Sequence, residues 1–177
     1  MRNRKKARGK AVVPGLALKA LFLAFALVAG LVERWIPFEF VVPGVKLGLA
    51  NAVVLTALYL FPWPAALEIS LLKCLMTAIF TGMGVSFFYS LGGAVFSFAA
   101  MAPALRFGQN KIGPAGVSVL GAVFHNIGQI LVASLIMRTL MIVTYLPVLL
   151  ISGVVTGVLV GMLVKPLTDY IRKHLIK

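Results

Sequence analysis

Residues 12–32, VVPGLALKALFLAFALVAGLV, decide the fold. They carry a single charged side chain, Lys19, and a hydrocarbon core about 30 Å thick needs about 20 apolar residues in one helix. A basic flank precedes them, but the apolar part exceeds the about 7–15 residues of a signal peptide, and no A-x-A cleavage site follows. We therefore expect this stretch to remain in the mature protein as a membrane-spanning helix.

The whole chain is also rich in apolar residues and poor in charged ones. Of its 177 residues, 61% are hydrophobic and 12% are charged, whereas soluble domains average about 45–50% apolar and about 25% charged residues. Such a chain has too little polar surface to cover itself in water. The composition predicts an integral membrane protein and excludes a soluble α/β enzyme and a secreted disulfide scaffold. The single cysteine, Cys74, allows no disulfide within the chain and no cysteine-based metal cluster.

Further apolar runs complete a set of six spans. Three of them are long enough to cross a bilayer as single helices: 85–105, 116–137 and 145–164. Two shorter runs, 47–61 and 65–80, are separated by Pro62-Trp63-Pro64, which breaks a helix and suits the membrane interface. They form either two short or tilted spans or a re-entrant pair, and we favour two spans.

The basic residues predict the orientation. The chain has 17 Lys+Arg against 4 Asp+Glu, a formal charge of +13. Six spans place both termini on one side, and the opposite side then holds only Arg34, Lys46 and Arg138. The side of the termini holds Arg2, Arg4, Lys5, Lys6, Arg8, Lys10, Lys19, Arg106, Lys111, Lys165, Arg172, Lys173 and Lys177. The positive-inside rule therefore places both termini in the bacterial cytoplasm.

Three segments follow from this topology. We expect a basic cytoplasmic tail at 1–11, a six-span membrane domain at 12–166 and a second basic cytoplasmic tail at 167–177. Beside a membrane, such tails contact anionic lipid headgroups. Nucleic acid is not an expected partner, because the chain has no soluble part to carry a groove-reading element.

Lys73 lies near the middle of the run 65–80. An ionised lysine at the centre of a span costs about 2.5–3.5 kcal/mol, so it should face the interior of the bundle. Glu68, five positions earlier, is about 140° away around a helix and is a poor neighbour for it. Lys73 either pairs with another helix or snorkels to the surface, or it holds an anionic ligand. We favour the ligand role.

A second polar cluster, His125-Asn126-Ile127-Gly128-Gln129, lies in the run 116–137. His125 and Gln129 share a helix face, and Asn126 lies beside them. The cluster is either a set of hydrogen bonds between helices, worth about 0.6 kcal/mol each on average, or the wall of a ligand pocket, which we favour. His125 has no second histidine or carboxylate nearby in sequence, so we predict neither a metal nor a cofactor.

The run VPGVKLGLAN at 42–51 forms the third cluster. Pro43-Gly44 makes a turn, Lys46 stands at the outer mouth, and Asn51 enters the second span about one turn in. A helix that starts within the protein offers free N–H groups and the positive end of its dipole to an anion. The alternative is a capped turn at the membrane interface.

Small residues recur at every fourth position in the first and last spans. Gly153, Gly157 and Gly161 should allow another helix of the bundle to approach closely. Ala20 and Ala24 form a similar ridge, which faces either the bundle itself or a partner protein.

The run VPGVKLGLAN, the HNIGQ motif at 125–129 and the glycine-spaced last span together resemble a family of small bacterial six-span proteins. They are called Gx transporters or, by an older name, heptaprenyl diphosphate synthase component I. This family looks like the substrate-binding S components of energy-coupling-factor (ECF) transporters. The resemblance implies a six-helix bundle with a ligand pocket under its first outer loop. It also implies that the ridge of Ala20 and Ala24 docks onto a membrane coupling protein driven by two ATPases.

The older family name suggests an enzyme, and the carboxylates test it. Prenyl diphosphate synthases hold Mg²⁺ with aspartate-rich motifs, because hard cations favour carboxylate oxygens. This chain has one aspartate, Asp169, and three scattered glutamates, and it lacks a Walker lysine loop and a dinucleotide fingerprint. We therefore expect no catalytic activity of its own.

We predict an all-α, ECF S-component-like bundle of six transmembrane helices that binds a vitamin, a flavin or quinone precursor, or an isoprenoid-like ligand. The predicted ligand contacts are Lys46, Asn51, Lys73, His125, Asn126 and Gln129. Two alternatives remain open. The chain is a non-catalytic membrane component associated with polyprenyl diphosphate synthesis, or it is a structural subunit of a membrane redox assembly.

Overall fold

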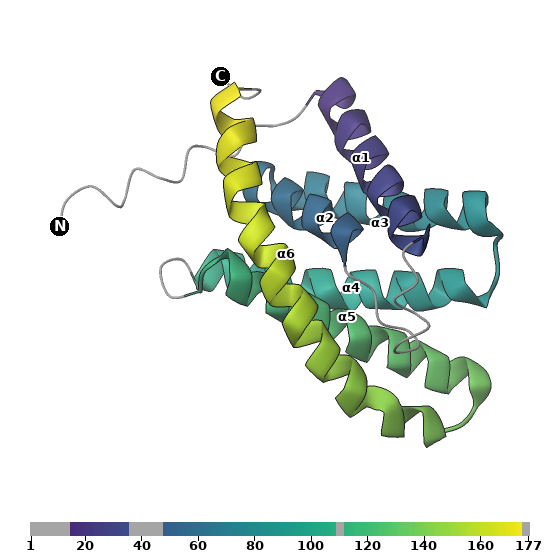
Figure 1. Ribbon diagram of the computed structural model, residues 1–177. Helices are drawn as coiled ribbons and strands as arrows, with labels where there is room; N and C mark the ends of the chain where they lie inside the picture. The colour runs from purple at the N-terminus through teal and green to yellow at the C-terminus, as the bar shows by residue number, and fades with distance from the viewer. Residues whose placement is uncertain (1–14, 36–47, 109–111, 175–177) are drawn as a thin grey trace.

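A computed structural model describes residues 15–35, 48–108 and 112–174. Every regular element of this part is helical (Figure 1), which confirms the all-α prediction. In chain order the elements are α1 (Leu16–Trp35), α2 (Leu49–Leu60), α3 (Trp63–Thr81), α4 (Val85–Phe107), α5 (Pro114–Met137), the 3-10 helix η2 (Met141–Tyr145) and α6 (Leu146–His174).

Five helices of the described part are long and apolar enough to cross a membrane: α1, α3, α4, α5 and α6, the last together with η2. The chain is therefore a multi-pass membrane protein. Helix α2 differs, because its 12 residues rise only about 18 Å at about 1.5 Å per residue. Of the two short runs on either side of Pro62, only the second becomes a helix of spanning length. Pro64 lies in the first turn of that helix, where its missing N–H costs no hydrogen bond.

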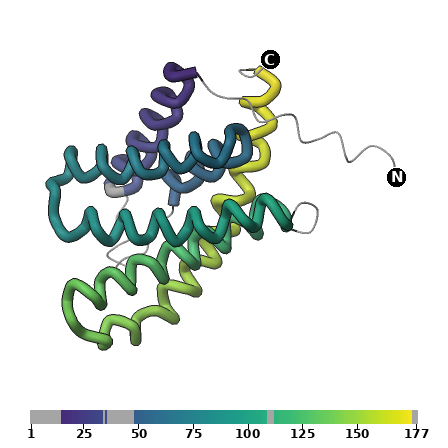
Figure 2. The backbone as a smooth tube through the Cα atoms, turned by 180° about the vertical axis from the view of Figure 1, so that it is seen from behind, coloured from purple at the N-terminus to yellow at the C-terminus, as the bar shows by residue number. Residues whose placement is uncertain are grey.

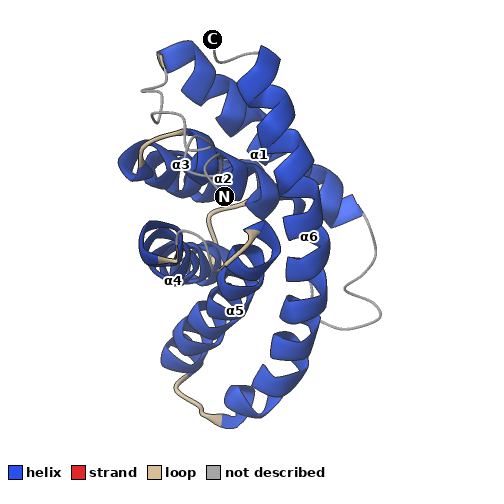
Figure 3. Cartoon of the chain, turned by 90° about the vertical axis from the view of Figure 1, so that its left-hand side faces the viewer, coloured by secondary structure: helices blue, strands red, loops and turns tan. Residues whose placement is uncertain are grey.

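The short helix α2 is the most enclosed element of the bundle. Helices α1, α3 and α6 pack around it, and eight of its 12 residues are buried. Figure 3 shows α2 beside α3 on one side and α6 on the other. Leu55 of α2 is among the largest fully buried side chains, with Ile69 of α3 and Val164 of α6. The hydrophobic core therefore surrounds α2.

Helices α3, α4, α5 and α6 pack as successive neighbours along the chain. Figure 2 shows the stack from behind, with α4 between α3 and α5. Glycines make the contact between α5 and α6 close, because a β-carbon on Gly157 would lie 2.7 Å from Cα of Val119. Gly161 meets the backbone of Ala115 in the same way. The predicted packing of the glycine ridge inside the bundle is confirmed.

Helix α6 continues past the end of the span expected at 145–164. It runs through Pro166 to His174, so residues 167–174 of the expected tail are helical. Val164, Thr168 and Ile171 are buried, whereas Lys165 and Lys173 are exposed. Because its buried positions are spaced by three and four residues, this segment is an amphipathic helix. Its many polar residues lower the mean hydropathy, so the apolar face is not evident from hydropathy alone. The end of α6 and the start of α1 lie at the same end of the molecule, at the top of Figure 1.

Candidate functional site

The ammonium group of Lys73 lies against the amide of Asn51. Lys73 Nζ donates a hydrogen bond to Asn51 Oδ1 over 2.9 Å, and the contact is partly buried. Lys73 stands near the middle of α3, and Asn51 belongs to the first turn of α2. The structure therefore brings together two of the residues that the sequence predicted as ligand contacts.

The amino end of α2 lies within the bundle. A β-carbon on Gly48, the residue before α2, would lie 3.6 Å from Cγ2 of Val160, which stands in the middle of α6. Gly48 itself has φ of 81°, in the left-handed region that favours glycine. The first turn of α2 thus begins at the level of the middle of α6. The positive end of this helix dipole therefore lies among the other helices.

Glu33 of α1 binds this same helix end. Its Oε1 accepts a hydrogen bond from the N–H of Gly48, and its side chain is partly buried. A carboxylate at a helix N-terminus is stabilised by the helix dipole and satisfies an N–H that has no intrahelical acceptor. Glu33, Gly48, Asn51 and Lys73 form what we call the polar centre, built from α1, α2 and α3.

Glu33 is not among the ligand contacts predicted from the sequence. Its only sequence signal is a carboxylate at the end of one apolar helix, fifteen positions before a glycine that opens the next helix. The hydrogen bond depends on how α1 and α2 pack together, which periodicity does not reveal.

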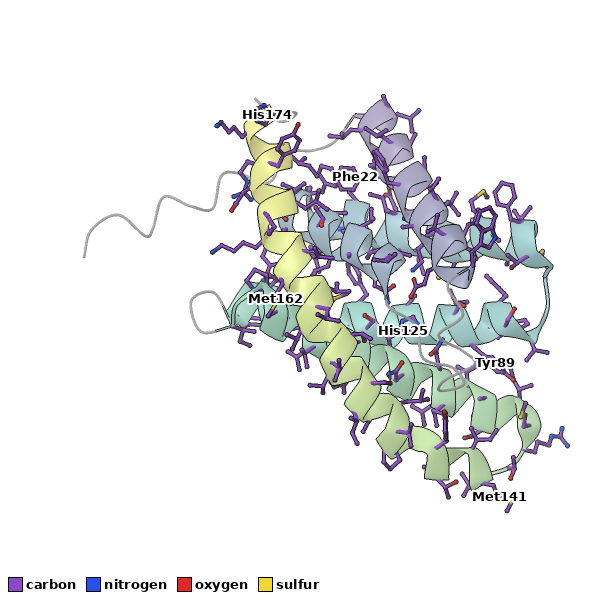
Figure 4. The ribbon with its side chains drawn as sticks, viewed as in Figure 1. Phe22, Tyr89, His125, Met141, Met162 and His174 are labelled. Carbon is purple, nitrogen blue, oxygen red and sulfur yellow. The ribbon has the colours of Figure 1, made fainter. Side chains whose placement is uncertain are left out.

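His125 of α5 faces α4. Its imidazole ring packs over Gly93, where an added β-carbon would lie 2.7 Å from Cε1 of the ring. Nδ1 of His125 is buried, and Figure 4 shows this residue in the interior of the bundle. Gln129, one turn further along α5, is partly buried. Because Gly93 has no side chain, the imidazole ring fits between α4 and α5 at this point.

Asn126 faces a different helix. Its Nδ2 donates a hydrogen bond of 2.6 Å to the carbonyl of Leu149 on α6, and it packs against Gly153. These contacts of His125 and Asn126 lead to α4 and α6 respectively, so the two neighbouring side chains point in different directions. The contact of Asn126 is a hydrogen bond between helices, the alternative role considered for the cluster. Its part in binding a ligand stays a prediction.

The remaining predicted positions are Lys46, Ala20 and Ala24, none of which belongs to the polar centre. Lys46 lies outside the residues that the structure describes. Ala20 and Ala24 are exposed on α1, beside the exposed apolar side chains Leu21 and Phe25. An exposed, small-residue face is available to lipid or to a partner. Among the described residues, no three His, Cys, Asp or Glu side chains lie close enough to hold a metal ion.

The long apolar helices and the polar centre among them define a helical, multi-pass membrane protein. The family model described as heptaprenyl diphosphate synthase component I matches residues 22–167. The chain therefore belongs to the heptaprenyl diphosphate synthase component I family, which confirms the resemblance found in the sequence. No curated protein and no solved structure matches the chain.

Proposed function

We propose that this protein is a membrane-embedded substrate-binding subunit, similar to an ECF S component, that takes up a small molecule with an anionic group. The single observation that carries the proposal is the contact of Lys73 with Asn51 at the inner end of the half-length helix α2. Ionisable groups inside a membrane bundle are expensive and usually mark substrate or ion sites. Transporters place such sites at the ends of interrupted helices.

In this proposal the protein lies in the cell membrane with its termini facing the cytoplasm. The ligand enters the bundle from the outer side. The ammonium of Lys73 balances the anionic group and Asn51 adds an amide. The carboxylate of Glu33 holds the Gly48 N–H at the amino end of α2. Lys46, His125, Asn126 and Gln129 supply further polar contacts. The bundle then moves as a whole against a coupling protein and its ATPases. Ala20 and Ala24 support this docking role, because they are exposed on α1.

The distribution of carboxylates supports a role without catalysis. The carboxylate of Glu33 accepts a hydrogen bond from the N–H of Gly48, and Glu68 forms an ion pair with Lys19. Asp169 is exposed on the last part of α6. Within the described residues, carboxylates this dispersed do not make the shared Mg²⁺ site that diphosphate chemistry requires. We therefore assign the ligand chemistry to binding.

The test is native mass spectrometry of the full chain after gentle detergent extraction. We expect a small molecule to remain bound to the wild type, and Lys73→Ala and His125→Ala to lose most of it. Glu68→Ala is the matched control, since it removes a charge from the same helix at an exposed position. Lys73→Ala and His125→Ala proteins that insert normally and keep their ligand would overturn the proposal.

The family description favours a second candidate function. A member of the heptaprenyl diphosphate synthase component I family could serve as the membrane partner of a soluble, aspartate-rich synthase. Proteins that co-purify with the chain discriminate the two functions. A coupling protein with ATPases supports uptake, whereas a soluble synthase, together with changed prenyl chain length when this chain is removed, supports the second function.

A further inference from the structure

The last part of α6 runs alongside α2 over the whole length of that short helix. Val160 lies beside Gly48 at the amino end of α2. At the other end, Arg172 donates a hydrogen bond of 3.3 Å from its guanidinium to the carbonyl of Tyr59. The two helices are therefore parallel neighbours, and each end of α2 has its own contact with α6.

Before Pro166, α6 packs on α5 and also touches α2 at Val160, and after Pro166 its described contacts are with α2 and the core around it. Gly153, Gly157 and Gly161 fix the first part onto α5, and Gly161 meets Pro114 and Ala115, where α5 begins. The helix then continues past the start of α5. Pro166 has no N–H to donate to the carbonyl four residues earlier, and its ring crowds that turn. A proline inside a helix is a usual place for a bend.

Beyond the proline, the terminal segment 167–174 is held against α2 and the core around it. Arg172 bonds to Tyr59, and Ile171 is buried in the core cluster that includes Leu58 and Leu60. The hydroxyl of Thr168 is buried and finds no hydrogen-bond partner within the described part of the chain. A buried hydroxyl without a partner penalises the packing that buries it. The terminal segment is therefore tied to α2 by the bond of Arg172 and the burial of Ile171, and the unsatisfied hydroxyl of Thr168 opposes that packing.

We propose that the terminal segment 167–174 of α6 controls the polar centre through α2, with Arg172 as a positioning residue. Helix α2 is short, mostly buried and held at both ends, so a shift of Tyr59 moves Gly48 and Asn51 with it. The segment lies at the end of the molecule where α1 starts (Figure 1), and its exposed face carries Lys173 and His174. A force applied there would reach Lys73 through Asn51. The inference rests on the proposed function only in taking the polar centre as a ligand site.

The test is hydrogen–deuterium exchange of the full chain in detergent, with no ligand added. Arg172→Gln should raise the exchange rate about threefold at residues 50–54, at the far end of α2, as well as at residues 57–61. Lys173→Gln is the matched control, because it removes the same charge from the adjacent exposed position, and it should change neither region. Arg172→Lys keeps a cation near the Tyr59 carbonyl and should restore most of the protection.

Three outcomes would overturn the proposal. Faster exchange confined to residues 57–61 and 168–174 would make Arg172 a local cap. An equal rise in the exchange rate in Lys173→Gln would show that the loss of positive charge, and not the loss of the bond to Tyr59, causes the rise. An equal rise in α3 and α5 would indicate general loosening. If Arg172→Gln fails to fold, Thr168→Val provides the test instead. It strengthens the packing of the terminal segment, so the exchange rate at residues 50–54 should fall rather than rise.

Ligand retention by the same variants separates this inference from the proposed function. If the wild type holds no small molecule while Arg172→Gln still loosens residues 50–54, the proposed function fails and the coupling stands. If the wild type holds a ligand and Arg172→Gln leaves residues 50–54 unchanged, the coupling fails and the proposed function stands.

Discussion

Lys73 of α3 and Asn51 of α2 are 22 positions apart in sequence and 2.9 Å apart at Nζ and Oδ1. Each residue alone has an ordinary alternative role, since lysines snorkel and asparagines cap turns. Their contact inside an apolar bundle links the middle of α3, which is long enough to span a membrane, to the start of the 12-residue helix α2. The arrangement gives an ammonium group a fixed direction, which a lysine that merely snorkels does not have.

A double-mutant cycle of Lys73→Met and Asn51→Leu should show a coupling free energy of about 1–2 kcal/mol. Hydrogen bonds to charged groups contribute about 1.5–3 kcal/mol in soluble proteins, and bonds between membrane helices reach about 1.7 kcal/mol at most. Both substitutions keep the side-chain volume near its original value. The measurement is the free energy of unfolding in mixed detergent–SDS micelles. Additive effects would mean that the contact contributes nothing measurable.

Glu33→Ala should destabilise the protein by about 0.5–2 kcal/mol, the range for losing a side-chain cap at a helix N-terminus. Glu33→Gln keeps an oxygen that accepts from the N–H of Gly48 and should lose only the interaction of the charge with the helix dipole, about 0.3–1 kcal/mol. Glu68→Gln is the control, because its ion pair with Lys19 is largely exposed and should contribute at most about 1 kcal/mol. Thermal unfolding in detergent measures all three. Equal effects at Glu33 and Glu68 would contradict the capping role.

Much of the fold was predictable from hydrophobicity alone. The expected spans 85–105 and 116–137 match α4 and α5 to within two residues at each end. Hydropathy works here because a bilayer requires a minimum apolar length. The run 47–61 is apolar like the others, but the helix described within it, α2, has 12 residues, fewer than the other spans, and is mostly buried by its neighbours.

The candidate site was predictable in its residue types and less so in its arrangement. Polar side chains inside spans identified Lys73 and Asn51, which lie together, and His125 and Asn126, which point toward different helices. Helical periodicity predicts which side chains share a face of one helix. It cannot predict which neighbouring helix each face meets. The role of Glu33 depends on such a meeting, so it emerged only with the packing of α1 on α2.

Gly157→Ala should destabilise the protein by about 1–3 kcal/mol, the usual cost of overpacking. The new β-carbon would lie 2.7 Å from Cα of Val119, and backbone cannot rotate aside as a flexible side chain does. Gly30→Ala in α1 is the matched control, since its β-carbon would meet only Cβ of Ala50 at an ordinary 3.5 Å. Alanine has the better helix propensity, so the control should be neutral or stabilising. Equal losses of unfolding free energy would contradict the close contact between α5 and α6.

Gly153→Ala should destabilise the wild type and be far better tolerated in an Asn126→Ala background. In the wild type the new β-carbon would lie 2.8 Å from Nδ2 of Asn126, which is held in place by its bond to Leu149. Removing the amide frees that space, so the double mutant should be more stable than the sum of the two single effects by about 1 kcal/mol. The free energies of unfolding of the four proteins check this. Strict additivity would show that Asn126 does not occupy the space beside Gly153.

Thr168→Val should stabilise the protein by about 1 kcal/mol. The side chain is 6% exposed and its hydroxyl is buried without a partner in the described structure, and leaving such a group unsatisfied costs about 1–3 kcal/mol. Valine has nearly the same shape and fills the same space with a methyl group. Thr81→Val at an exposed position is the control and should change the free energy of unfolding by at most about 0.5 kcal/mol. A loss of stability in Thr168→Val would mean that the hydroxyl is satisfied after all, by water or by a shifted carbonyl.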